Sequence, residues 1–117
     1  MSDKVILLVS STTTDTAQEV GQRRVHDLLK SKKVAFSELD GSLTENKEKR
    51  DQLFSASGLR GKYPQVFIES SSGDIKFVGG YDKMVELAES DSLDSSLLEA
   101  NPSIETFTKT FGSVSKE

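Results

Sequence analysis

Hydrophobic residues in this chain are concentrated in short runs, and most of these runs have the length of a β-strand. Residues 4–9 contain the continuous apolar run Val-Ile-Leu-Leu-Val. Such a run is typical of a strand that is covered on both faces, as in a parallel or mixed sheet. Residues 34–39 form a second run, in which Phe36 is a candidate core residue.

Two further runs predict an antiparallel hairpin. Residues 66–68 and 75–78 are rich in β-branched and aromatic side chains, and a short turn at Gly73 and Asp74 joins them. Pro64 stands at the start of the first of these strands, where a missing backbone N–H is tolerated.

Helical patterns fill two of the gaps between the strands. Asp15 and Gln18 form a capping box at the start of a helix that extends to about residue 31. Its apolar stripe consists of Ala17, Gly21, Val25, Leu28 and Leu29. Ser42 and Glu45 predict a second capping box, for a helix that reaches about residue 56 and docks through Leu53 and Phe54.

The remaining apolar residues predict two short helices and a tail. Asp82 is a good N-cap for a helix over residues 82–90, with Val85 and Ala88 pointing inward. Residues 93–100 predict the last helix, before Asn101-Pro102. Residues 101–117 are mostly polar, so we expect a flexible C-terminal tail, with a short docking helix as the alternative.

The element order is therefore β-α-β-α-β-β-α-α, in which the first two strands are parallel and the last two form a hairpin. This order predicts an α/β protein of the thioredoxin fold, with a four-stranded mixed sheet and helices on both faces. We expect one domain of this fold at residues 1–100, followed by the tail at residues 101–117.

Composition narrows the possible functions. The net charge of −4 is unfavourable for a nucleic-acid-binding protein, because neutralising phosphates requires clustered Lys and Arg. No apolar run approaches the roughly 18 residues that a membrane span requires. We therefore expect a cytoplasmic monomer whose partner is neither nucleic acid nor membrane. The chain holds no cysteine, so thiolate nucleophiles and disulfides are excluded.

Residues 62–82 resemble the second half of a glutaredoxin. The resemblance rests on Tyr-Pro-Gln-Val-Phe-Ile at residues 63–68 and on Gly-Gly-Tyr-Asp at residues 79–82. It implies a cis peptide bond before Pro64 and a glutathione groove between this proline and the glycine corner. Alignment on the first strand places Thr14 and Ala17 where glutaredoxins carry their cysteines, so the resemblance implies a scaffold without its catalytic thiols.

A closer resemblance is to the Src-homology-3-domain-binding glutamic-acid-rich-like family, whose members are glutaredoxin-like and lack the catalytic cysteines. It covers about residues 4–90, including the strand ending Val-Ile-Leu-Leu-Val-Ser-Ser and the charged segment at residues 44–50. The resemblance implies a redox-inactive, non-enzymatic protein-interaction module with an unidentified protein partner. Pro64 and Pro102 are the only prolines, so no Pro-x-x-Pro motif exists and binding of Src-homology-3 domains is not expected.

Two alternatives remain open. The first is a weak glutathione-binding protein that uses a residual groove, for which the resemblance supplies the candidate residues Tyr63, Pro64, Gly80, Tyr81 and Asp82. Arg60 or Lys62 would meet the glycine carboxylate of the ligand. The second is a glutathione-transferase-like enzyme that uses the hydroxyl of Ser10, Ser11, Thr12 or Thr14. Transferases need a second, helical domain, for which 117 residues leave no room. No metal site is expected.

Overall fold

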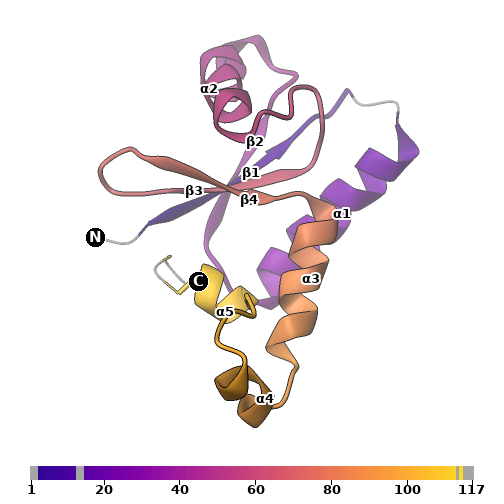
Figure 1. The fold of residues 1–117 in the computed structure, drawn as a ribbon. Coiled ribbons are helices and arrows are strands. Elements are labelled where there is room, and N and C mark those ends of the chain that lie inside the picture. The colour runs from indigo at the N-terminus through magenta and orange to yellow at the C-terminus, as the bar shows by residue number, and fades with distance from the viewer. Residues whose placement is uncertain (1–2, 13–14, 113, 115–117) are drawn as a thin grey trace.

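Four strands form one mixed sheet in the computed structural model, which describes residues 3–12, 15–112 and 114. The strand order is β2-β1-β3-β4 (Figure 1). β1 pairs in parallel with β2 and antiparallel with β3, and β3 pairs antiparallel with β4. The strands are β1 (Lys4–Val9), β2 (Phe36–Asp40), β3 (Gln65–Glu69) and β4 (Ile75–Gly79). The predicted fold class is confirmed.

β1 is buried on both faces, as its continuous apolar run predicts. Val5 and Leu7 belong to one core cluster, and Ile6 and Leu8 to the other. All four side chains are at most 7% exposed. Alternation along the strand therefore supplies both layers of the core at once.

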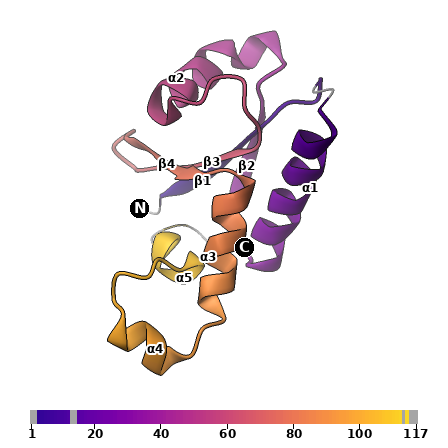
Figure 2. The same cartoon turned by 45° about the vertical axis from the view of Figure 1, so that its right-hand side comes forward.

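The helices cover the two faces unequally (Figures 1 and 2). On one face lie α1 (Thr16–Ser31), α3 (Tyr81–Asp91) and α5 (Phe107–Thr110), and on the other lies α2 (Lys47–Ser57). α4 (Ser95–Ala100) stands away from the sheet. Of the described residues, none belongs to a helix long and apolar enough to cross a membrane.

α1 begins as its sequence predicts. The Asp15 carboxylate accepts a hydrogen bond from the backbone N–H of Gln18, which satisfies one of the unpaired amides of the first turn. Val25 and Leu29 from the predicted stripe are buried, and Leu28 is half-buried. Ala17, the first residue of the predicted stripe, is exposed.

The predicted capping box at Ser42 is wrong. The Ser42 hydroxyl donates to the Asp40 carboxylate at 2.6 Å instead of capping a helix. A 3₁₀ turn, η1 (Thr44–Asn46), follows, and α2 starts only at Lys47. The rest of the prediction holds, because Leu53 and Phe54 are buried. Gly58 ends the helix with φ of 71°, a left-handed conformation that glycine adopts without strain.

α3 differs from its prediction at its start and on its inner face. Gly80 is the N-cap, and Asp82 lies within the first turn. The buried residues of α3 are Met84 and Leu87, while Val85 and Ala88 are half-buried. The predicted inner face was therefore wrong by one residue along the helix, and Val85 and Ala88 line a surface cleft instead.

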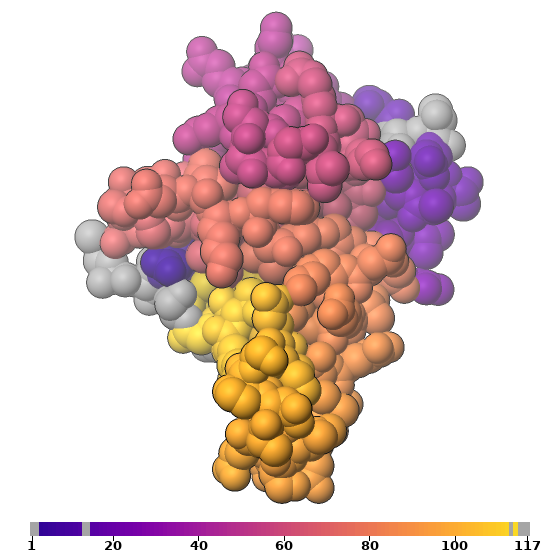
Figure 3. All heavy atoms as spheres, viewed as in Figure 1, coloured from indigo at the N-terminus to yellow at the C-terminus, as the bar shows by residue number. Residues whose placement is uncertain are grey.

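The C-terminal segment packs onto the sheet through a short helix. This is the alternative to the flexible tail expected at residues 101–117. Phe107, Phe111 and Val114 are at most 5% exposed and belong to the core cluster that contains Val5 and Leu7. The two phenylalanine rings stack with their centroids 4.4 Å apart. The core therefore extends past residue 100. By contrast, α4, beyond the end of α3, forms the projection at the bottom of Figure 3.

Replacing a buried aromatic residue of this segment will test its role in the core. We expect Phe111→Ala to lower the free energy of unfolding by about 3–5 kcal/mol, because it removes a fully buried ring and leaves a cavity. Leu97→Ala is the control, since Leu97 is 44% exposed on α4. Urea unfolding followed by circular dichroism measures both. Equal, small effects of the two substitutions would contradict the packing of α5.

Candidate functional site

The five predicted groove residues lie together in one cavity of about 610 Å³. It is formed where the loop before β3 meets the end of β4 and the start of α3. Ala17 at the start of α1 also lines it. The lining residues that matter for its chemistry are Tyr63, Pro64, Gly80, Tyr81, Asp82, Ala17, Lys62 and Gln65. The sequence thus identified residues that converge in space.

The Tyr63-Pro64 peptide bond is cis, as predicted, and Pro64 is buried. Among the described residues, the main chain of Tyr63 forms no hydrogen bond. The N–H and C=O of Tyr63 are therefore the kind of unpaired backbone groups that can pair with an extended ligand.

The side chain of Tyr63 packs against α2. Its ring packs edge-on against Phe54 at a centroid distance of 6.0 Å, within the core cluster on the α2 face. Burial raises the pKa of the Tyr63 phenol. Tyr63 therefore links the groove to the core cluster on the α2 face.

Gln65 holds the loop that leads to Pro64, a role that the sequence did not reveal. Its Nε2 donates to the carbonyl oxygens of Leu59 at 2.6 Å and Lys62 at 2.7 Å. Gln65 is only 1% exposed, and its Oε1 has no hydrogen-bond partner in the described part of the chain. A polar residue within a β-strand pattern was the only available signal, and its partners could not be derived from it.

Close packing requires glycine at positions 79 and 80. Neither Gly79 nor Gly80 has a positive φ, so unusual backbone angles do not explain these two glycines. A Cβ on Gly79 would lie 2.4 Å from the Cβ of Lys83, and one on Gly80 would lie 3.1 Å from the carbonyl oxygen of Pro64. The missing side chains allow the start of α3 to approach the proline loop closely.

Within the described part of the chain, the start of α3 presents unpaired backbone amides at the groove. Gly80 caps the helix without a side-chain hydrogen bond, and the Met84 N–H is the first to bond back, to the Gly80 carbonyl. The N–H groups of the first turn before it therefore have no partner within the helix. Such a helix end favours an anionic group, while the exposed Asp82 carboxylate favours a cationic one.

The two candidate cations are placed differently. Lys62 lines the groove. Arg60 turns toward α2, where its guanidinium lies 3.4 Å from the Asp51 carboxylate and 5.5 Å from the centroid of the Phe54 ring. Of these two, Lys62 is therefore the residue positioned to meet a ligand carboxylate.

The loop after β1 leads into α1, whose Ala17 presents a methyl group to the groove. Ala17 lies at the groove, whereas Thr14 falls outside the described residues. The Ser10 N–H donates to Oε1 of Gln22 at 2.7 Å, and the Ser11 N–H donates to Asp40 at 3.1 Å. The described part of the loop is thus fixed by side chains from α1 and β2.

Asp40 is the most strongly perturbed carboxyl group near this loop. Burial alone would raise its pKa, but hydrogen bonds from the hydroxyl and N–H groups of Ser11 and Ser42 outweigh burial and lower the pKa to about 2. The carboxylate therefore remains ionised and ties the loop to the end of β2. The described residues include no group of three acidic or histidine side chains that would hold a metal ion.

Comparison with known proteins agrees with this architecture. The sequence model of the family described as "SH3-binding, glutamic acid-rich protein" matches residues 3–99. No curated protein sequence matches the chain significantly.

Two solved structures are similar in fold. A buckwheat glutaredoxin–glutathione complex has a TM-score of 0.57 at 17% identity, covering 97% of this chain and 83% of the other. The holo form of glutaredoxin C1 from Populus tremula x tremuloides has a TM-score of 0.54 at 24% identity, covering 90% and 85%. These similarities establish the glutaredoxin-like thioredoxin fold.

The stability of the protein will depend on the ionisation of Asp40. Its pKa falls from 3.8 to about 2 on folding, so the carboxylate stabilises the fold above pH 4, and this contribution is lost as the pH falls through about 2. Because water screens this half-buried group, we expect Asp40→Asn to cost about 1 kcal/mol at pH 7 and almost nothing at pH 2.

Urea unfolding at both pH values measures this difference. Asp27→Asn is the matched control, because Asp27 is exposed on α1 and accepts no hydrogen bonds from the loop. A cost for Asp40→Asn that is the same at the two pH values would contradict the role of the ionised carboxylate.

Proposed function

Because the chain belongs to the SH3-binding, glutamic acid-rich protein family and holds no cysteine, we propose that it is a redox-inactive, non-enzymatic protein-interaction module. Thiol–disulfide exchange begins with the attack of a cysteine thiolate on a disulfide. A serine or threonine hydroxyl does not replace this nucleophile, because it does not ionise in the range where a thiol does. A cytoplasmic location is part of the proposal.

One observation carries the proposal, namely the open groove over Pro64. Its wall includes the main chain of Tyr63, which is unpaired among the described residues, and the first turn of α3. An extended peptide can pair with exposed backbone N–H and C=O groups, as a strand pairs with the edge of a sheet. Lys62 and Asp82 provide opposite charges at the groove for selecting the side chains of such a peptide.

The partner that we propose is not a Src-homology-3 domain, despite the name of the family. Ligands of these domains are polyproline helices with Pro-x-x-Pro spacing. The prolines of this chain stand at positions 64 and 102. Pro64 is buried within the groove wall, so it is not available as part of a linear motif.

Glutathione is a second candidate ligand for the same groove. One structural neighbour is a complex of a glutaredoxin with glutathione. In this chain, the Tyr63 main chain suits the cysteinyl backbone of the tripeptide, the α3 amides suit a carboxylate, and Asp82 suits the γ-glutamyl ammonium group. Binding without turnover would make glutathione a competitor or co-ligand of the protein partner.

A charge reversal in the groove will test the interaction proposal. We expect Asp82→Lys to reduce the recovery of specific partners at least about fivefold in quantitative affinity purification, because it places a positive charge on the groove wall. Asp27→Lys is the matched control, since it changes the net charge equally on the exposed face of α1. If both variants retain the same partners as the wild type, the groove is not the interaction surface.

A titration of isotope-labelled protein with reduced glutathione will test the alternative. We expect amide shifts at Tyr63, Gly80, Tyr81 and Asp82, with a dissociation constant of about 1 mM, which corresponds to about 4 kcal/mol of binding free energy. The amide of Ser72, in the exposed turn between β3 and β4, serves as an internal control. No shift up to about 10 mM ligand would remove glutathione as a candidate.

A further inference from the structure

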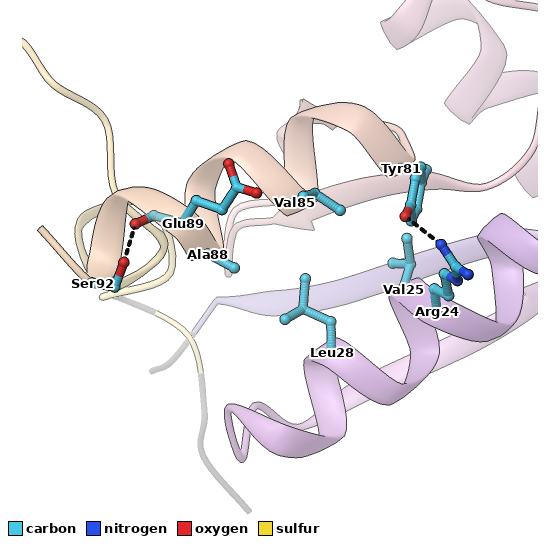
Figure 4. A pocket seen from close by; sticks show the side chains of 8 residues that line it. All are labelled: Arg24, Val25, Leu28, Tyr81, Val85, Ala88, Glu89 and Ser92. Atoms are coloured by element: carbon cyan, nitrogen blue, oxygen red, sulfur yellow. Dashed lines mark hydrogen bonds between the residues drawn. The ribbon is translucent and has the colours of Figure 1, made fainter.

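A second cavity, of about 440 Å³, lies between α1 and α3 (Figure 4). Its apolar lining comes from Val25, Leu28, Val85 and Ala88. Val25 is buried, and the other three side chains are half-buried. Tyr81 is shared between this cleft and the groove over Pro64, but the remaining lining residues are different. The cleft is therefore a separate apolar surface, which the proposed peptide-binding function does not use.

The two ends of the cleft carry opposite charges. At one end, Nη1 of Arg24 donates to the Tyr81 hydroxyl at 3.0 Å, while Glu89 stands at the other end (Figure 4). Within the described part of the chain, Arg24 has no carboxylate partner and Glu89 has no cationic one. Both side chains are exposed. The apolar strip is thus bordered by one unneutralised positive charge and one unneutralised negative charge.

Because Arg24 and Glu89 lie at opposite ends of the cleft, two copies related by a two-fold axis can pair their opposite charges. When a second copy lies antiparallel on the cleft, its Glu89 faces Arg24 of the first copy, and its Arg24 faces Glu89 of the first. The same operation places the apolar linings of the two clefts opposite each other. A two-fold axis repeats every contact, so one favourable charge pair always occurs twice.

We propose that a second copy of this chain covers the α1–α3 cleft and forms a weak, antiparallel homodimer. The sequence analysis expects a monomer. The small apolar area makes the proposed association weak and strongly dependent on concentration. The apolar side chains provide the driving force for association. Arg24 and Glu89 determine the orientation, because a parallel arrangement would bring like charges together.

Sedimentation equilibrium of the whole chain at low salt tests this proposal. We expect self-association with a dissociation constant between about 10 µM and about 1 mM, and weaker association at high salt. Arg24→Glu and Glu89→Arg should each raise the dissociation constant about tenfold, because each turns two attractive contacts of the dimer into repulsive ones.

The double variant Arg24→Glu/Glu89→Arg distinguishes this arrangement from other forms of association. It restores opposite charges across the two-fold axis, so its dissociation constant should return to within about threefold of the wild-type value. Arg23→Glu is the matched control, since it changes the net charge as Arg24→Glu does but lies outside the cleft, beside Glu19. Circular dichroism confirms that each variant is folded.

Three outcomes overturn the proposal. The first is a monomer up to about 1 mM protein. The second is association that Arg24→Glu does not weaken more than Arg23→Glu does. The third is a double variant that remains as weak as the single variants. Weakening by each cleft substitution together with recovery in the double variant supports the antiparallel dimer.

Discussion

The burial of β1 on both faces is the constraint on which the rest of the structure depends. This strand lies between β2 and β3 in the sheet, and its alternating side chains supply both core clusters. Because both of its faces must be covered, α2 is required on one side and α1 and α3 on the other. The pairing of β1 with Gln65–Glu69 in turn fixes where Pro64 and the groove begin.

The groove depends on close packing between segments that are distant in sequence. Gln65 holds the loop before β3, and Gly79 and Gly80 let α3 approach Pro64. The unpaired main chain of Tyr63 and the open first turn of α3 therefore lie at one cavity. Ala17 provides a methyl group on the α1 side of the same cavity. This arrangement places an open groove on a glutaredoxin-like fold, in a chain that holds no cysteine for thiol chemistry.

Much of this architecture was predictable because it is encoded in local patterns. The apolar run of β1, the hairpin runs and the Asp15 cap each determine their element without reference to the rest of the chain. The predictions failed where an interaction with a distant or competing residue determines the local structure. Asp40 binds the Ser42 hydroxyl and removes the predicted cap. The i, i+4 spacing of Phe107 and Phe111 suits a docking helix, but in a polar tail it does not reveal the cluster that they join.

Hydrogen exchange at the Tyr63 amide tests the central claim, an open binding groove, most directly. In the free protein this amide should exchange rapidly, while the amide of Ile68 in β3 is protected, because only the latter belongs to the sheet. Adding a partner recovered by the wild-type protein should slow exchange at Tyr63 and in the first turn of α3. Protection of Tyr63 in the free protein, or unchanged exchange in the complex, would contradict this account.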